Sequence, residues 1–228
     1  MFEWPRFVAL TLALIAWSAP FSARAGEYNL SISEKFVEYG GHSTRAIAVN
    51  GQIPGPTLHF KEGEDVVIHV TNTMSIDSSI HWHGMLVPAA MDGVPGLNGF
   101  KGIKPGETFT YRFHVRQSGT YWYHAHSGLQ EQMGLYGSIV IDPAKPDPVK
   151  ADRDYVVMLA DFPPDQADRI LANLKVNSDY YNHAHRTIGD FFSDVSRDGW
   201  KATVDDRRMW GQMRMDPTDL SDVSDYTF

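Results

Sequence analysis

Short runs of β-branched and aromatic residues alternate with turn residues from about residue 27 to residue 143. Within residues 65–72 the period-two pattern places Val66, Ile68 and Val70 on one face of a strand, with the intervening side chains on the other. About seven or eight such strands predict a mainly β fold, a two-sheet sandwich. The clearest strands are predicted over residues 28–39, 43–51, 64–72, 78–84, 107–115, 119–126 and 136–142.

The pattern changes after Pro143. A proline-punctuated linker covers residues 143–150, and one more strand is predicted over residues 153–162. Apolar residues then recur at helical spacing. They are Ile170, Leu171, Leu174, Ile188, Phe191, Phe192 and Val195. We therefore expect one sandwich domain over residues 26–143. Residues 144–228 are expected to form a linker, a strand and a partly helical segment that begins a truncated second domain.

The two ends of the chain carry separate signals. Residues 1–25 combine an apolar block with the small-residue pattern Ala23, Arg24, Ala25, which predicts an export signal. The apolar block from Phe7 to Trp17 is shorter than the roughly 20 residues that span a bilayer, so no stable membrane anchor is expected. Export without cysteine fits a periplasmic location. At the other end, Tyr226–Phe228 are strand-forming residues, and we expect a strand that is cut off there; the alternative is a short terminal strand that docks on the existing sheet.

Charge and composition exclude several classes of function. The chain has 20 Lys and Arg against 28 Asp and Glu, a formal charge of −8, so no nucleic-acid partner is expected. The absence of cysteine excludes disulfides, thiolate zinc sites, thiol nucleophiles and iron–sulfur ligation within these 228 residues. It also excludes copper bound through a cysteine sulfur of this chain.

Two identical histidine spacings fall on predicted strands. In IHWHG, His81 and His83 point to one face of the strand, and in YWYHAH the same holds for His124 and His126. If these strands are neighbours, their backbones lie about 4.8 Å apart and four imidazoles converge. Imidazole clusters without thiolate suit copper, zinc, iron or nickel, and copper heads the affinity order for divalent ions. We therefore predict a metal site.

The remaining histidines do not fit this pattern. One His-x-His pair alone is more often incidental than functional. The metal site is predicted because two such pairs occur on predicted strands. His183 and His185 have the same spacing but fall in the helical part, where residues two apart point in nearly opposite directions. They are interpreted as a surface pair. Four single histidines are expected to be ordinary strand residues: His42, His59, His69 and His114.

These motifs resemble a known family. IHWHG, then MDGVPG at residues 91–96, then GTYWYHAHSGLQEQMGLYG at residues 119–137, are similar to the first domain of multicopper oxidases of bacterial copper-resistance systems. The resemblance continues through residues 153–162 and the helical part, so it covers nearly the whole chain that follows the export signal. The resemblance implies a cupredoxin-like Greek-key sandwich.

The same resemblance implies roles for the site residues. His81 would bind the type 2 copper, and His83, His124 and His126 the type 3 pair, in the cluster that reduces dioxygen to water. Asp92 resembles the acidic residue of the family that lies near the cluster, although an Asp-Gly turn explains it equally well. The other cluster ligands and the type 1 copper would come from missing C-terminal cupredoxin domains. Cuprous ion or phenol-like reductants would be the substrates.

Two other classes of function use the same histidines. A stand-alone exported protein could bind or buffer copper without turnover. A zinc hydrolase is the least supported, because no acidic residue follows either histidine pair at the short spacing of hydrolytic motifs.

Overall fold

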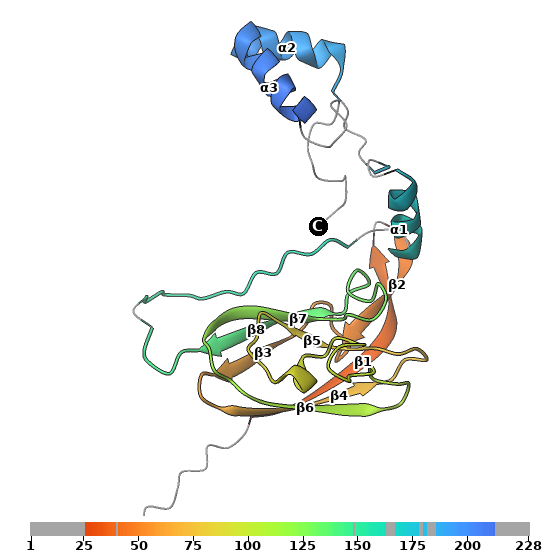
Figure 1. Cartoon of the computed structure of the whole chain (residues 1–228), viewed down its shortest axis with the longest axis vertical. Coiled ribbons are helices and arrows are strands. Elements are labelled where there is room, and N and C mark those ends of the chain that lie inside the picture. The colour runs from red at the N-terminus through yellow and green to blue at the C-terminus, as the bar shows by residue number, and fades with distance from the viewer. Residues whose placement is uncertain are drawn as a thin grey trace, which may run out of the picture.

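The structure is a computed structural model that describes residues 26–39, 41–147, 149–162, 167–177, 180–181 and 186–212. The predicted export signal, the C-terminal strand at Tyr226–Phe228 and the pair His183 and His185 lie outside the described residues. Most of the described chain folds as a sandwich of two sheets, followed by an extended segment and three helices (Figure 1). The prediction of a mainly β, two-sheet fold with a partly helical segment is confirmed.

Each sheet contains four strands. The first has the order β2-β1-β4-β6 and the second the order β3-β8-β7-β5. Neighbouring strands are antiparallel, except that β1 runs parallel to β4 and β3 parallel to β8. In the first sheet the bounds are β1 (Gly26–Tyr39), β2 (His42–Val49), β4 (Asp65–Asn72) and β6 (Thr108–His114). In the second they are β3 (Gly55–Lys61), β5 (His81–His83), β7 (Gly119–His124) and β8 (Tyr136–Asp142).

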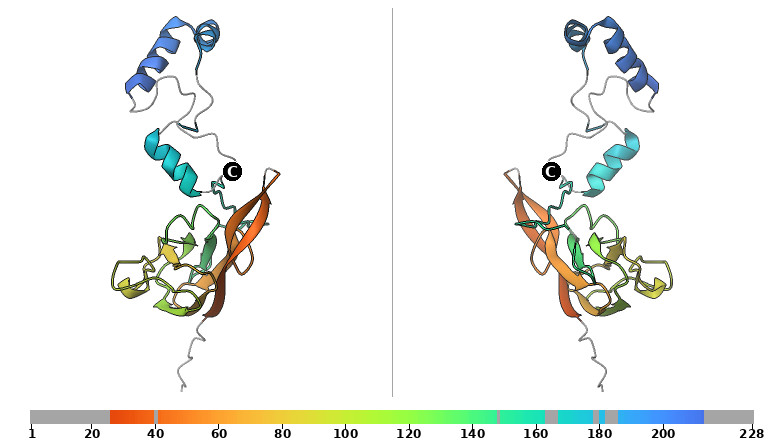
Figure 2. Two further views of the ribbon diagram at one scale, coloured as in Figure 1. Left: turned by 90° about the vertical axis from the view of Figure 1, so that its right-hand side faces the viewer. Right: turned by 90° about the vertical axis from the view of Figure 1, so that its left-hand side faces the viewer.

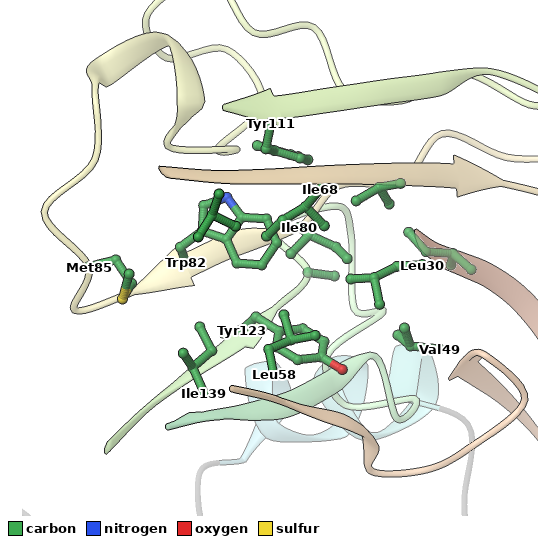
Figure 3. Close-up of a cluster of buried hydrophobic side chains, with 14 of the residues drawn as sticks. Leu30, Val49, Leu58, Ile68, Ile80, Trp82, Met85, Tyr111, Tyr123 and Ile139 are labelled. Carbon is green, nitrogen blue, oxygen red and sulfur yellow. The ribbon is translucent and has the colours of Figure 1, made fainter. Parts of the chain in front are cut away.

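The core lies between the sheets, and the predicted alternation in β4 decides which side chains fill it. Val66, Ile68 and Val70 are buried, whereas the residues between them are only partly so. At the centre Trp82 is fully buried and packs edge-on against Tyr111, with ring centroids 5.0 Å apart (Figure 3). Because Trp82 points into the core, its two histidine neighbours in β5 point to the opposite side.

Two predictions about strands were incomplete or wrong. Strand β3 was missed because Pro54, Gly55 and Pro56 indicate a turn, although Leu58 and Phe60 alternate into the core behind them. Residues 153–162 were predicted as a strand, but they run extended and largely exposed without joining either sheet. Their sequence favours a strand, yet a strand forms only where a neighbour pairs with its backbone.

The helical spacing was interpreted correctly. Helices α1 (Ala167–Val176) and α2 (Ile188–Asp198) occupy the predicted positions, and α3 (Trp200–Gln212) follows (Figure 2). A capping box begins α2, in which Thr187 accepts from the Asp190 backbone N–H and the Asp190 carboxylate accepts from the Thr187 backbone N–H. Among the described residues, none of the helices combines the length and the apolar character that crossing a membrane requires.

Candidate metal centre

The two histidine motifs lie on adjacent strands. Strand β5 pairs antiparallel with β7, in a register that sets His81 opposite His124 and Trp82 opposite Tyr123. Side chains directly opposite each other lie on the same face of a sheet. The period-two spacing of each motif and this register together bring the histidines to one side, while Trp82 and Tyr123 fill the core.

Four imidazole rings converge at this place. The ring centroid of His81 lies 5.6 Å from that of His83, 5.5 Å from His124 and 4.9 Å from His126. The rings of His124 and His126 are 4.9 Å apart. One nitrogen from each of His81, His83 and His124 can be chosen so that all three lie within 4.8 Å of one another. The structure thus brings together all four histidines singled out in the sequence.

Asp92 lies beside the first of these rings. His81 Nδ1 donates to the backbone carbonyl oxygen of Asp92 at 2.8 Å, and the Asp92 carboxylate lies 3.5 Å from the same nitrogen. A carbonyl can only accept, so the proton of a neutral His81 is on Nδ1 and the lone pair is on Nε2. The next residue, Gly93, lets the backbone after Asp92 pass close to that of Ile80. Its φ is +80°, and a Cβ there would lie 1.8 Å from the Ile80 carbonyl oxygen.

His124 is held by two neighbours that the motif reading did not assign. Its Nδ1 pairs with the Glu131 carboxylate, and its ring stacks on the Trp122 indole with centroids 3.9 Å apart and planes 12° from parallel. His124 is also 5% exposed, the only buried ring of the four. A carboxylate accepts from an imidazole, so in neutral His124 the lone pair is on Nε2.

The donor set fits a metal ion such as copper. His83 Nδ1 and His124 Nε2 are 3.2 Å apart. Two nitrogens bound to one ion through bonds of roughly 2.0–2.1 Å at a tetrahedral angle lie about 3.3 Å apart, so this pair already has the required spacing. Neutral imidazoles whose second nitrogen is hydrogen-bonded to an oxygen are the usual arrangement at protein metal sites. His81 has this arrangement with the Asp92 carbonyl oxygen, and His124 Nδ1 contacts the Glu131 carboxylate in the corresponding position.

The local charges favour neutral imidazoles beside anionic carboxylates. Desolvation, followed by the neighbouring His124 and His81, lowers the pKa of His83 and likewise that of His126. The hydrogen bond from His124 lowers the pKa of Glu131. Unprotonated nitrogens and a charged carboxylate therefore persist to lower pH than in an unfolded chain, which is the protonation state that cation binding requires.

The other candidates from the sequence lie elsewhere. His59 and His114 are exposed on β3 and β6, and His69 bonds to Thr110 on the first sheet. Glu131 was missed because it follows His124 by seven positions, across a turn to which no strand or helix period applies. Only the hydrogen bonding of the folded turn places it next to His124.

Comparison with known proteins agrees with this geometry. A family model described as multicopper oxidase matches residues 31–146. The chain is 48% identical over 222 residues to copper resistance protein A of Pseudomonas syringae pv. tomato, covering 93% of this chain and 36% of that protein. It is 49% identical over 207 residues to copper resistance protein A of Escherichia coli, covering 91% of this chain and 34% of that one. The chain therefore spans about a third of the length of these curated relatives.

A solved structure shares the fold of the sandwich. The blue copper oxidase from Nitrosomonas europaea aligns with a TM-score of 0.51 at 38% identity, over 54% of this chain and 41% of that one.

Proposed function

The chain belongs to the multicopper oxidase family, and we propose that it is the N-terminal part of a periplasmic oxidase of the copper-resistance type. Copper is the cofactor that this family implies. In the proposed reaction the complete oxidase removes electrons from cuprous ion or a phenol-like reductant and reduces dioxygen to water. The observation that carries the proposal is the convergence of four imidazoles: His81 and His83 of β5, His124 of β7 and His126 just after β7.

The proposed roles of the histidines rest on the resemblance of the two motifs to those of the family. His81 would hold the type 2 copper, while His83, His124 and His126 would hold the type 3 pair. Bound copper would supply one-electron redox chemistry and a site for dioxygen. The 3.2 Å separation of His83 Nδ1 and His124 Nε2 supports their assignment to a common ion.

The protein's own contribution is to hold the rings neutral and oriented. His81 Nδ1 donates to the Asp92 carbonyl oxygen and His124 Nδ1 contacts the Glu131 carboxylate, so Nε2 of each ring is the nitrogen left for a metal, and stacking on Trp122 fixes the plane of the His124 ring. We propose that the Asp92 carboxylate, 30% exposed and 3.5 Å from His81, holds or passes a proton at the edge of the site. The backbone carbonyl oxygen of Asp92 also accepts from His81 Nδ1 and so orients that ring. Asp92 would therefore serve both as a turn residue and as a residue of the site.

This chain is proposed to supply half of an active site and not a complete one. It offers four imidazoles and no thiolate, since its 228 residues contain no cysteine. The type 1 copper and the remaining cluster ligands are proposed to come from C-terminal cupredoxin domains of the same protein. We expect the chain alone to bind copper without oxidase turnover. A stand-alone copper-buffering protein would also bind copper without turnover. The two hypotheses differ in one expectation: only a fragment of an oxidase should gain activity when C-terminal cupredoxin domains are added.

Copper titration of the purified chain tests the proposal. The double variant His81→Ala, His124→Ala removes one ring from each strand and should weaken copper binding at least tenfold. The matched control is His59→Ala, His114→Ala, which removes two exposed strand histidines outside the centre. Unchanged affinity in the first variant, or equal loss in both, would refute the site.

Two further measurements test the proposed division of the active site. The copper-loaded chain should lack the intense blue absorption of a thiolate–copper bond and should consume no oxygen with a phenolic reductant. Mixing it with separately produced C-terminal domains of a relative should restore turnover if the chain is the first part of an oxidase. Turnover by the chain alone would contradict the proposed division.

A further inference from the structure

The Glu131 carboxylate touches the most buried ring of the metal centre. It pairs with His124 Nδ1, on the side of the ring away from His83. The His124 side chain is 6% exposed and that of Glu131 is 34% exposed, so the carboxylate links a buried ring to the surface. Asp92 lies against a different ring, that of His81. The centre therefore has a separate acidic residue beside each of its two strands.

We propose that Glu131 is a positioning residue that keeps the proton of His124 on Nδ1 and directs Nε2 toward the nitrogen of His83. The proposal rests on the function proposed above, because it assigns Glu131 a role toward the copper that His124 would bind. Without an acceptor at Nδ1, a neutral imidazole can carry its proton on either nitrogen. A proton on Nε2 would occupy the position that faces His83 and would have to leave before a metal could bind there.

The turn that carries Glu131 is anchored to the segment that precedes β5, the strand of the other histidine motif. Gln130 is 5% exposed; its amide donates to the Asp77 carbonyl oxygen at 2.7 Å and accepts from the Ser78 hydroxyl at 2.7 Å. Asp77 and Ser78 lead directly into β5. The backbone of Glu131 also accepts from the Gly134 N–H at 2.9 Å, closing the turn. These bonds fix where the Glu131 side chain begins relative to both strands.

Trp122 supplies the second constraint on the same ring. Its indole stacks on His124, which prevents the imidazole from tilting but leaves it free to exchange its proton between nitrogens. Trp122 also borders His83, at 4.9 Å between centroids. Stacking thus sets the plane of His124, whereas the carboxylate decides which nitrogen is available. Only the second contribution depends on the charge and hydrogen bonding of Glu131.

The test uses the whole chain with Glu131→Ala, Glu131→Gln and a control, Glu34→Gln. Glu34 is a matched control because its side chain is 36% exposed and pairs with Arg45 at 3.5 Å, on β1 and outside the centre. Nitrogen-15 NMR of the metal-free chain reports the tautomer of His124. Copper(II) affinity is measured by competition with a chelator, and the nitrogen hyperfine pattern of bound copper by paramagnetic resonance.

In the parent and the control, His124 should carry its proton on Nδ1. Glu131→Ala should shift His124 toward the other tautomer, change the hyperfine pattern and weaken copper binding by about 10–100-fold, as is typical for loss of such a partner. Glu131→Gln keeps an acceptor oxygen and should restore the tautomer and most of the affinity. This rescue separates positioning from general damage to the fold.

Two results would overturn the role of Glu131: an unchanged His124 tautomer in Glu131→Ala, or copper affinity equal to that of Glu34→Gln. Failure of the parent chain to bind copper at all would instead refute the proposed function, and the tautomer of the metal-free chain would still decide whether Glu131 controls His124. The two proposals therefore fail in different measurements.

Discussion

The β-sandwich and the helical segment are stabilised by different means. In the sandwich, side chains such as Ile32, Ile68 and Trp82 are fully buried between two sheets. In the described part of the helical segment, residues 167–212, burial is confined to Ala167, Ile170 and Thr203. There the described interactions are polar ones, such as the capping box of α2 and the ion pair that joins Arg207 of α3 to Asp194 of α2.

This difference explains why the metal centre belongs to the sandwich. A site that brings nitrogens from two strands to 3.2 Å needs supports that do not move relative to each other. Trp82 supplies such a support, because its buried indole fixes β5 from the core side while His81 and His83 occupy the other face. The helices carry apolar side chains such as Ile188 and Phe192 on their surface, 79% and 64% exposed, and offer no comparable frame.

The largest expected effect comes from the tryptophan of the core. Trp82→Ala would leave a cavity beside Tyr111 and Tyr123 and should lower the free energy of unfolding of the sandwich by about 3–5 kcal/mol. Copper affinity should fall as well, since β5 loses its support. Denaturation in urea and copper titration measure the two effects.

Trp200→Ala provides the control from the helical segment. Trp200 is 64% exposed and meets Phe191 edge-on at 5.6 Å, so its loss should cost about 0.5–1.5 kcal/mol and leave copper affinity unchanged. Equal costs for the two tryptophans would remove the distinction between the regions.

Glycines with positive φ give a second, smaller contrast. Gly93 (φ +80°) and Gly199 (φ +86°) both adopt backbone conformations that cost about 1–3 kcal/mol in alanine. A Cβ at Gly199 meets nothing within 4 Å, whereas at Gly93 it would lie 1.8 Å from the Ile80 carbonyl oxygen. Gly93→Ala should therefore cost about 1–3 kcal/mol more than Gly199→Ala, because the backbone must also move.

Only the first of these substitutions should affect the metal centre. Displacement at Gly93 shifts Asp92, whose carbonyl accepts from His81, so copper affinity should drop in Gly93→Ala and not in Gly199→Ala. Denaturation and copper titration of both variants decide this. An equal loss of stability in the two variants would mean that the close approach to Ile80 costs nothing.

The sequence predicted the parts of the site that depend on local periodicity. Alternation along a strand is fixed by backbone geometry, so the common face of His81 and His83 and the burial of Trp82 could be inferred without a structure. The helices of residues 167–198 were predicted in the same way. What local pattern could not supply is pairing. The register of β5 on β7 and the approach of Glu131 across a turn both join residues that share no period.

Strand pairing also explains the two errors in the prediction of strands. Leu58 and Phe60 form part of β3 because β8 lies beside them, despite Pro54 before the strand and Pro56 within it. Residues 153–162 have a more strand-like sequence but pair with neither sheet. Strand propensity describes a side chain on a half-buried pleated surface, and the surrounding chain decides whether such a surface exists.

The smallest expected effect is a difference in the response of the two regions to acid. The pKa values of His83 and His126 are lowered from 6.5 by desolvation and by neighbouring imidazoles. Near pH 6.5 the unfolded chain therefore binds more protons at these two histidines than the folded chain does. The free energy of unfolding should fall as the pH drops through that value. In the helical segment, hydrogen bonds with Thr187 lower the pKa of Asp190 from 3.8, so its contribution is complete above that value and is lost only at lower pH.

Between pH 7 and pH 5 the metal-free sandwich should thus lose stability while Asp190 contributes no change. Urea denaturation at pH 7, 6 and 5, followed by amide NMR signals from each region, separates the two responses. The variant His83→Gln, His126→Gln should flatten the dependence in the sandwich, because glutamine takes up no proton in either state. Asp190→Asn serves as the control and should leave the slope of the sandwich over this range unchanged. An undiminished slope in the histidine variant would show that the acid sensitivity comes from groups outside the metal centre.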